Sequence, residues 1–338
     1  INQLDSNYFS MHAFTQDFVR AKLNRDLGFK EAAQARWINW YVNFLSPFSE
    51  DWLDWQNYDA LDAEWGNVRS LVNGCLESKS YTTFLTLWQG LRGYSLFRGY
   101  WDERQEWMDT LATMARQRND SAVLTQAMFY QGQTLVHLDE ADTRGGALQL
   151  LEEAWGLGPH IDPDIQFGIL VYIAAIYLKR QQFDVAKSWL DKKEDIINPS
   201  NFSRDRQQCA YDYYVAAISM GRKNYESAEA SYRKALKLAE STHWEKQTVY
   251  IKGELVKLLL QTGALDEAEA LLSIVLKAVK HHKDKRAIAR SYYDLALLAE
   301  QRSQTDAFRH WANLAEQEFR KLRMTVAANK IQQWLLSK

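Results

Sequence analysis

Among the side chains that could do chemistry, Ser231 and Lys234 come first because they have the S-x-x-K spacing of a serine acylase. Such enzymes use the serine as a nucleophile and carry companion S-D-N and K-T-G elements. Neither element accompanies this pair. The surrounding residues follow helical spacing, so we predict that Ser231 and Lys234 lie by coincidence on a solvated helix face.

Two further patterns are open to simpler explanations than chemistry. His281 and His282 offer metal-binding nitrogens, but adjacent helical residues point about 100° apart and no cysteine or carboxylate triad is nearby. An exposed basic turn is the preferred interpretation. Asp266, Glu267 and Glu269 are expected at the start of a helix, where negative charge suits the helix dipole. No catalytic or metal-binding constellation remains, so we expect no enzyme activity from this chain.

Nucleotide and nucleic-acid chemistry are not indicated either. The sequence contains no phosphate-binding loop of the form G-x-x-x-x-G-K-[ST], so no ATP or Mg²⁺ site and no other cofactor is expected within it. With a net charge of −2, nothing global indicates nucleic acid as a partner. The strongest positive cluster is interpreted as a solvated loop between repeats, and it comprises Lys277, Lys280, Lys283, Lys285, Arg286 and Arg290.

The elements that would position these residues are helices. Only four prolines and fifteen glycines occur in 338 residues, and apolar residues recur at spacings of three and four almost throughout. Of the thirteen tryptophans, eight precede residue 110, where they are expected to form core. Cys75 and Cys209 are predicted to be buried residues of a reducing compartment, and no apolar run approaches the length of a membrane span. Because the chain opens at Ile1 in mid-pattern, we expect a fragment of a longer protein.

A repeated helical hairpin organises the chain. Within residues 167–238, five residues of one hairpin recur at the same offsets in the next: Ala174, Tyr177, Phe183, Ala186 and Leu190, then Ala216, Ser219, Tyr225, Ala228 and Tyr232. A small residue in the first helix, an aromatic residue at the turn and an alanine in the second helix resemble a tetratricopeptide-repeat (TPR) hairpin.

The alanine position of the second helix, here called the anchor, extends this pattern along the chain. It recurs at Arg104, Ala147, Ala186, Ala228, Ala268 and Ala307, which predicts about six hairpins of roughly 40 residues from residue 81 onward. Arg104 departs from the pattern because the other anchors are alanine. Breaker residues are expected between hairpins at Asn119-Asp120, Gly156 to Pro163, Asn198-Pro199, Ser241-Thr242 and Lys283-Asp284. The resemblance implies an all-α, right-handed superhelical solenoid of TPR-like hairpins preceded by a helical adaptor.

The segments before the hairpins carry a second resemblance. The tract MHAFTQDFVRAKL (11–23) resembles the last helix of the winged-helix domain in STAND-type (NB-ARC/NACHT-like) signalling NTPases. We expect a helix over residues 8–27 with Phe14, Phe18, Ala21 and Leu23 on one face. Another helix is expected over 36–48, with Trp37, Trp40, Tyr41 and Phe44, ending near Pro47.

Two later segments continue this resemblance. Glu64, Asn67 and Arg69, within a helix expected over 61–77, are similar to the family's next signature, and residues 90–115 resemble its first sensor hairpin. The resemblance implies three parts: the end of a winged-helix-like segment (1–28), a helical adaptor (29–80) and the TPR-like solenoid (81–338). It also implies that the chain's own ATPase module, with ATP and Mg²⁺, lies upstream.

The TPR resemblance also assigns a binding groove, because the first helix of each TPR hairpin lines the concave face. Carried onto this sequence, the groove positions are Val171, Lys179, Tyr213, Tyr250, Lys257, Gln261, Tyr292 and Glu300. Three tyrosines on one ribbon suit a protein- or peptide-binding surface, because tyrosine combines contact area with a polar tip. Packing of these tyrosines between repeats stays open as the alternative.

These observations favour recognition as the function. The chain is interpreted as the cytoplasmic sensor region of a bacterial STAND-type NTPase, which binds a protein, a peptide or a small molecule and relays occupancy to the ATPase. The fragment is expected to be monomeric, without membrane contact. Two alternatives are a free-standing TPR scaffold for protein–protein interaction and the sensor part of an ATP-dependent transcriptional regulator whose DNA-binding domain lies elsewhere.

Overall fold

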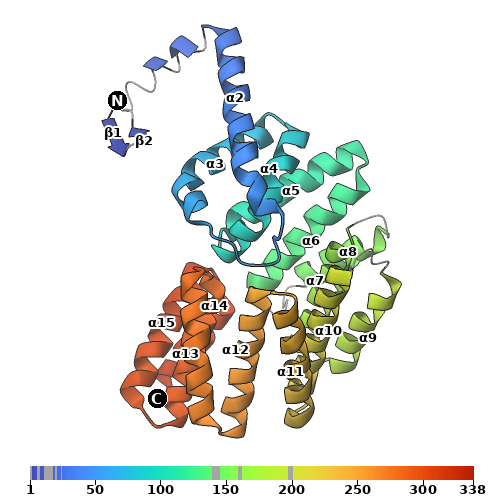
Figure 1. The fold of residues 1–338 in the computed structure, drawn as a ribbon, viewed down its shortest axis with the longest axis vertical. Coiled ribbons are helices and arrows are strands. Elements are labelled where there is room, and N and C mark those ends of the chain that lie inside the picture. The colour runs from blue at the N-terminus through green and yellow to red at the C-terminus, as the bar shows by residue number, and fades with distance from the viewer. Residues whose placement is uncertain are drawn as a thin grey trace.

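The computed structural model describes residues 2–5, 8–10, 18–19, 21–23, 25–138, 145–158, 162–196 and 201–338. Helices carry the fold in this part of the chain (Figure 1). Two short antiparallel strands, β1 (Asn2–Asp5) and β2 (Tyr8–Ser10), precede them. Within the same ranges, no helix has both the length and the apolar character needed to cross a bilayer.

The strands correct the expectation that a helix begins at residue 8. Tyr8–Ser10 pairs with Asn2–Asp5 as an antiparallel strand. The expectation came from the helical spacing of later residues, which gives no information about a strand partner. Residues 18–19 and 21–23 are helical, but Phe14 and the rest of 11–17 lie outside the described residues. Phe18 is 63% exposed, so within the chain it does not pack as the expected apolar face would.

In the described ranges, six helical hairpins form the solenoid, as predicted. They are α4 (Tyr81–Phe97) with α5 (Trp101–Arg118), α6 (Ser121–Leu138) with α7 (Gly146–Gly156), α8 (Pro163–Lys179) with α9 (Phe183–Asp191), α10 (Asn201–Gly221) with α11 (Tyr225–Ser241), α12 (Glu245–Thr262) with α13 (Leu265–His281), and α14 (Lys285–Gln301) with α15 (Thr305–Lys321). Helix α16 (Thr325–Leu336) covers the last hairpin, and the 3₁₀ helix η2 (Lys192–Asp195) extends α9. Each predicted anchor lies in the second helix of its hairpin.

The adaptor region ahead of the hairpins contains α2 (Leu27–Leu45), the 3₁₀ helix η1 (Ser46–Ser49) and α3 (Asp59–Glu77). Helix α2 runs across the boundary expected at residue 28 and projects away from the solenoid (Figure 1). It ends just before Pro47, as the missing amide proton of proline requires. The expected aromatic core forms where this region meets the first hairpin, and it includes Trp52, Trp55, Trp88 and Trp107. By contrast, Trp37 and Trp40 on α2 are 40% and 52% exposed. The core prediction is therefore wrong for these two residues.

The repeated small residues let the helices of each hairpin approach closely. Ala174, Ala186, Ala216 and Ala228 are almost completely buried between neighbouring helices. The aromatic residue at the first turn, Phe183, lies against Gly221 of the next hairpin, where any Cβ would overlap its ring. The TPR-like pattern therefore describes real packing within and between hairpins.

A single type of turn joins most of the helices. Its middle residue has a left-handed backbone, with φ between 50° and 61° at Lys79, Asn119, Gln181, Lys223, His243, Lys283, Ser303 and Arg323, and glycine takes this role at Gly99 and Gly263. The following amide donates to a carbonyl five residues back, for example Asp284 N to Val279 O at 3.0 Å. This hydrogen bond satisfies the open helix end, and its repetition keeps the angle between successive helices similar.

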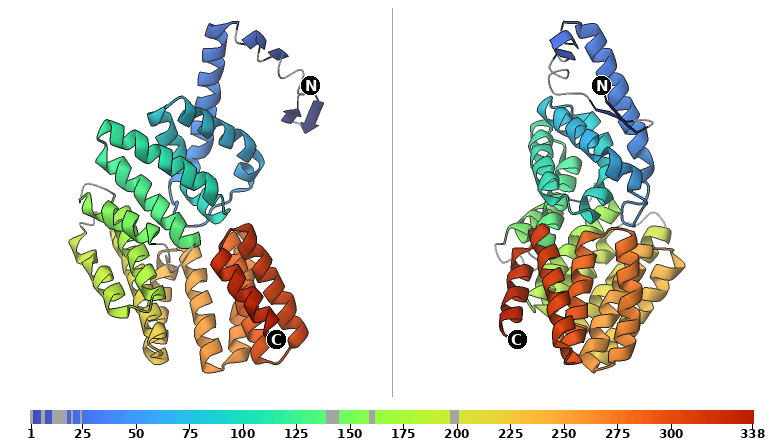
Figure 2. Two further views of the ribbon diagram at one scale, coloured as in Figure 1. Left: turned by 180° about the vertical axis from the view of Figure 1, so that it is seen from behind. Right: turned by 90° about the vertical axis from the view of Figure 1, so that its left-hand side faces the viewer.

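The solenoid curves until its first and last hairpins meet (Figure 2). Trp101 of α5 packs in one apolar cluster with Ala289, Phe308 and Leu322 of the last hairpin. Arg98, at the end of α4, donates to Asp62 Oδ1 at 2.8 Å and to His282 O at 2.6 Å. The array is therefore closed, and its concave face surrounds a central space.

Helix α2 is held against α4 by a close backbone approach at Gly90. A Cβ at this position would overlap the carbonyl oxygen of Leu45 and lie 2.9 Å from its Cβ. We expect Gly90→Ala to lower the free energy of unfolding by about 1–3 kcal/mol, because backbone cannot rotate away from an added methyl group. Gly74→Ala is the control: nothing lies within 4 Å of a Cβ there, so helix propensity should raise stability by about 0.5–1 kcal/mol. Urea denaturation of both variants measures the difference, and equal stability of the two would contradict the packing described.

Candidate functional site

The concave face encloses a cavity of about 290 Å³ at the centre of the closed array. Its wall is built mainly by the first helices of the hairpins, α4, α6, α8, α10, α12 and α14. This placement follows from the repeat, because the first helix of each hairpin lies on the inner side of the curve. This cavity is therefore a candidate functional site.

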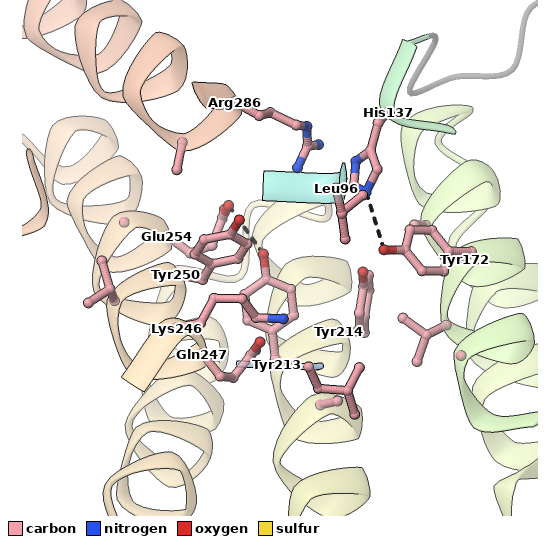
Figure 3. A pocket seen from close by; sticks show the side chains of 18 of the residues that line it. Leu96, His137, Tyr172, Tyr213, Tyr214, Lys246, Gln247, Tyr250, Glu254 and Arg286 are labelled. Carbon is pink, nitrogen blue, oxygen red and sulfur yellow. Dashed lines mark hydrogen bonds between the residues drawn. The ribbon is translucent and has the colours of Figure 1, made fainter. Parts of the chain in front are cut away.

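Tyrosine side chains from three helices meet in the cavity (Figure 3). They are Tyr172 of α8, Tyr213 and Tyr214 of α10, and Tyr250 of α12. Tyr250 Oη donates to Asp284 Oδ2 at 2.8 Å, and Tyr213 Oη donates to Glu254 Oε1 at 3.4 Å. Burial raises the pKa of all four phenols, so they stay neutral and can donate hydrogen bonds.

Charged side chains surround these tyrosines. Six described cations line the cavity, namely Lys179, Arg206, Lys246, Lys257, Arg286 and Arg290, against the three anions Asp164, Glu254 and Asp294. Lys257 Nζ lies 2.7 Å from Glu254 Oε1. Burial, helped by the charge of Lys257, lowers the pKa of Lys179 to about 8, and burial lowers that of Lys246 to about 8. Further carboxylates lie directly behind this lining, because Asp284 accepts from Tyr250 and Asp51 pairs with Arg206, so cations and anions are interspersed around the cavity.

Asp294 gives the cavity a pH-dependent charge. Burial raises its pKa from 3.8 to about 7, the charge of Lys257 opposes this rise, and its Oδ1 atom has no hydrogen-bond partner. Because the folded protein binds this proton more tightly than the unfolded chain, the stabilisation present at low pH is lost as pH rises from about 4 through 7.

We expect Asp294→Asn to remove this dependence. Between pH 5 and pH 8 the wild type should lose on the order of 2 kcal/mol of stability through this group, and the variant should not. Denaturation at both pH values measures the slope, with the exposed Asp306→Asn as control. Equal pH dependence of Asp294→Asn and wild type would show that Asp294 is ionised throughout.

The structure brings most of the predicted groove residues together. Val171, Lys179, Tyr213, Tyr250 and Lys257 all line the cavity. Gln261 lies in a neighbouring hollow that also includes Lys179 and Lys257. Their role in binding stays a prediction.

Tyr292 and Glu300 lie elsewhere. Tyr292 stacks on Trp311 with ring centroids 5.7 Å apart, and Glu300 Oε1 accepts from Trp334 Nε1 at 3.1 Å. For Tyr292 the cause is a slip of two residues in the alignment: α12 begins at Glu245 and α14 at Lys285, so Tyr250 corresponds to Arg290. Two residues turn a helix by about 200°, which moves a side chain to the opposite face. Glu300 corresponds to Leu260, which does not line the cavity either.

The corrected alignment identifies two cavity residues that sequence reasoning missed. Arg286 and Arg290 stand where α12 has Lys246 and Tyr250, and both line the cavity. The expectation of a solvated basic loop is therefore wrong for these two arginines. Lys283 of the same tract lies at the surface, where Nζ is 2.6 Å from Asp59 and 3.0 Å from Asp62. The available signal was the spacing of four between Arg286 and Arg290 on a first helix.

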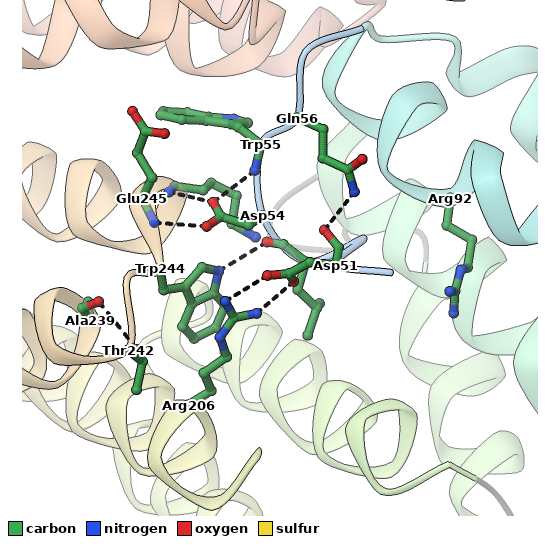
Figure 4. Close-up of polar contacts among 12 residues, drawn as sticks. Asp51, Asp54, Trp55, Gln56, Arg92, Arg206, Ala239, Thr242, Trp244 and Glu245 are labelled. Carbon is green, nitrogen blue, oxygen red and sulfur yellow. Dashed lines mark hydrogen bonds and ion pairs between the residues drawn. The ribbon is translucent and has the colours of Figure 1, made fainter. Parts of the chain in front are cut away.

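The link between η1 and α3, here called the connecting segment (residues 50–58), makes polar contacts with α10 and with the start of α12 (Figure 4). Asp51 accepts two hydrogen bonds from Arg206, at 2.7 and 2.8 Å. Asp54 accepts from the backbone amides of Glu245 at 2.9 Å and Lys246 at 2.7 Å, which caps the start of α12. The next residues of this segment, Trp52 and Leu53, contribute to the cavity wall.

A buried hydrogen-bond network reaches the cavity from α5. The fully buried Arg104 donates to Arg92 O at 2.8 Å, to Ser95 Oγ at 2.9 Å and to Gln133 Oε1 at 2.5 Å. Gln133 Nε2 then donates to Tyr172 Oη at 3.0 Å. The anchor that departs from alanine therefore positions side chains of the cavity.

The other patterns singled out in the sequence lie outside the cavity. Lys234 Nζ is 3.0 Å from Oδ1 of the buried Asp212, while the Lys234 side chain itself is largely exposed. His282 is not part of an exposed turn as expected, because it stacks on Trp55 with ring centroids 4.5 Å apart and its Nε2 lies 3.0 Å from Glu245. Asp266 and Glu267 lie in the first turn of α13. No metal-binding group of three or more His, Cys, Asp or Glu side chains exists among the described residues.

The signature residues of the adaptor hold helices together. Glu64 Oε2 accepts from Tyr41 Oη at 2.5 Å and from Asn67 Nδ2 at 3.0 Å, which joins α3 to α2. Arg69 Nη2 lies 3.4 Å from Glu103 Oε1 of α5. These contacts give the three residues a structural role.

The fold and the cavity define a helical-repeat protein of the TPR-like class, with a closed solenoid around a central pocket. No protein-family model and no curated protein sequence matches the chain.

Solved structures with similar arrangements include BtubC (BKLC) from P. vanneervenii, with 15% identity, TM-score 0.45, and coverage of 66% of this chain and 92% of that one. A STAND protein with a tetratricopeptide repeat sensor from Pyrococcus horikoshii has 16% identity and TM-score 0.49 over 88% of this chain and 42% of its own. Rap protein complexed with competence and sporulation factor has 12% identity and TM-score 0.48 over 90% and 97%.

Proposed function

We propose that this chain is a recognition domain whose central cavity binds the ligand, and that it forms the sensor region of a cytoplasmic STAND-type signalling NTPase. The observation that carries the recognition part is the cavity itself. Inner helices from hairpins far apart in sequence converge there, and they bring tyrosines and charged side chains to one space. Such a concave site with a few convergent polar groups is typical of ligand binding.

The connecting segment supports a route from the cavity to the upstream module. Trp52 and Leu53 form part of the cavity wall, and the same segment follows η1 and α2 directly. Helix α2 packs against α4 at Gly90 and leads back toward the N-terminus. A ligand that contacts the connecting segment would favour one position of α2 over another, which is how occupancy shifts a two-state equilibrium.

Sequencing the gene upstream of the Ile1 codon tests the NTPase part of the proposal. The reading frame upstream of the Ile1 codon should encode a G-x-x-x-x-G-K-[ST] loop followed by an α/β and winged-helix pattern. A start codon close to Ile1, with no such loop, would contradict this part and leave the recognition part standing.

One observation favours a second candidate, a free-standing TPR scaffold. Leu27, Phe29 and Trp40 on α2 are 64%, 57% and 52% exposed, and exposed apolar side chains on one helix are typical of a contact with another protein. The gene sequence separates the two candidates, because the scaffold needs no nucleotide-binding module.

A further inference from the structure

Within the described ranges, two polar side chains of the central cavity lack a hydrogen-bond partner, and we propose that they bind the carbonyl group of an uncharged small molecule with an aromatic or apolar body. The two groups are the hydroxyl of Tyr214 on α10 and the carboxamide of Gln247 on α12. This ligand class rests on the recognition function proposed above and names the chemistry that the cavity would recognise.

The other tyrosines of the cavity have polar partners, which sets these two groups apart. Tyr172, Tyr213 and Tyr250 each share a hydrogen bond with a neighbouring side chain. Gln247 is 8% exposed, so the fold removes most bulk water from its carboxamide without supplying a partner. Its polar atoms and the Tyr214 oxygen nevertheless remain open to a molecule inside the cavity (Figure 3). Polar groups in this state are typical of a site that a ligand completes.

A hydroxyl and a carboxamide together suit a carbonyl group. Burial raises the pKa of Tyr214, so its hydroxyl stays neutral and can donate. The Gln247 carboxamide offers two N–H donors and one carbonyl acceptor. A ligand carbonyl oxygen has two lone pairs and can accept from both side chains, and the Gln247 oxygen is then available to an N–H of an amide ligand.

The charges around the cavity are balanced, which disfavours an ionic ligand. Arg206 pairs with Asp51 at 2.7 Å, and Lys257 pairs with Glu254 at 2.7 Å. An ion entering this space would have to break such pairs or lose its hydration without a partner, whereas an uncharged molecule leaves them intact. Six cations line the cavity, and six carboxylates lie in or directly behind the lining: Asp51, Asp54, Asp164, Glu254, Asp284 and Asp294.

Small residues leave room beside the two polar groups. Ala217 lies one turn after Tyr214 on α10, and Gly253 lies on α12, where nothing comes within 4 Å of an added Cβ. Phe129 and Phe167 supply flat apolar faces to the same cavity. Its volume of about 290 Å³ suits a small molecule with an aromatic or apolar body better than a polypeptide.

Two fluorescent probes test the carbonyl contact. Prodan carries a ketone on a dimethylaminonaphthalene ring, and dimethylaminonaphthalene is the same ring system without the ketone. We expect prodan to bind at one site roughly tenfold more tightly than the compound that lacks the ketone. Tyr214→Phe and Gln247→Met should each reduce this preference about threefold, because each removes a hydrogen-bonding group and little volume. Either variant serves alone if the other does not fold.

The emission of bound prodan gives a second readout. It moves to longer wavelength when the ketone accepts a hydrogen bond, so it should move to shorter wavelength in Tyr214→Phe and Gln247→Met. Tyr292→Phe is the matched control, because this tyrosine stacks on Trp311 outside the cavity. It should leave both the preference and the emission unaltered.

The charge of the ligand is tested by displacement of prodan. Naphthylacetamide should displace it at least roughly tenfold more strongly than naphthylacetate or naphthylethylamine, the anionic and cationic counterparts. Equal or stronger displacement by either ion would overturn the assignment to an uncharged ligand. Equal displacement by a capped hexapeptide would overturn the assignment to a small molecule.

The carbonyl contact and the recognition site can fail separately. Equal binding of both probes, unaffected by Tyr214→Phe and Gln247→Met but abolished by the cavity-filling Ala217→Trp, would overturn the carbonyl inference and leave the recognition site intact. Binding of both probes that Ala217→Trp does not change would overturn the recognition site itself.

Discussion

Arg104→Ala should lower the free energy of unfolding by about 3–5 kcal/mol, the largest effect we expect from any single change. The guanidinium group of Arg104 is completely buried. Its Cζ atom lies 5.0 Å from the ring centroid of Trp88 and 5.0 Å from that of Tyr130. Removing this side chain leaves a cavity between α4, α5 and α6 and takes the donor away from Arg92 O, Ser95 Oγ and Gln133 Oε1. Urea denaturation gives the magnitude, and the exposed Arg116→Ala on the same helix is the control.

A second substitution separates the two causes. Burial lowers the pKa of Arg104 to about 10, which reflects the cost of burying its charge. Arg104→Met keeps most of the side-chain volume and removes this cost. It should therefore cost less than Arg104→Ala, with the loss of the donor as the remaining penalty. If Arg104→Ala were no more destabilising than Arg116→Ala, the hydrogen-bond network that leads to Gln133 and Tyr172 would not stabilise the fold as described.

Asp54→Ala should release the connecting segment from the solenoid and lower the free energy of unfolding by about 2–4 kcal/mol. Three backbone amides lose their acceptor together: those of Glu245 and Lys246 at the start of α12, and that of Trp55. Asp54 is only 7% exposed, so water does not replace the lost carboxylate without opening the site.

Hydrogen exchange locates this effect. In Asp54→Ala, amides in residues 50–58 and at the start of α12 should exchange faster, while helices α8 and α9 stay protected. Asp59→Ala is the matched control, because its ion pair with Lys283 is exposed and contributes less than about 1 kcal/mol. Unchanged exchange in residues 50–58 would mean that the connecting segment does not depend on this carboxylate.

Sequence reasoning could predict the elements of this fold because their causes are local. Apolar spacing, the small residues at Ala174 and Ala216, and the aromatic turn residue Phe183 act between helices that are close in sequence. The inner position of the first helices follows from the same repeat, which is why Tyr213 and Tyr250 could be assigned to the concave side.

The closure of the array could not be predicted from a local sequence pattern. Trp55 Nε1 donates to Asp284 Oδ2 at 3.0 Å across 229 residues, and Asp51 meets Arg206 across 155. No periodicity relates such residues, since the contact depends on the summed curvature of all the hairpins. The error at Tyr292 has another cause, because an irregular repeat length lets a small slip in alignment reverse the face of a helix.

The central claim, that the cavity is the recognition site, is tested most directly by asking what the protein retains there. Immobilised wild type and Ala217→Trp, whose indole would fill the cavity, are incubated with the low-molecular-mass fraction of the source cells, washed and analysed by mass spectrometry. Ala270→Trp, the same substitution on the exposed face of α13, is the control. We predict one compound held stoichiometrically by wild type and Ala270→Trp and lost from Ala217→Trp. Equal retention by all three proteins, or by none, would contradict the claim.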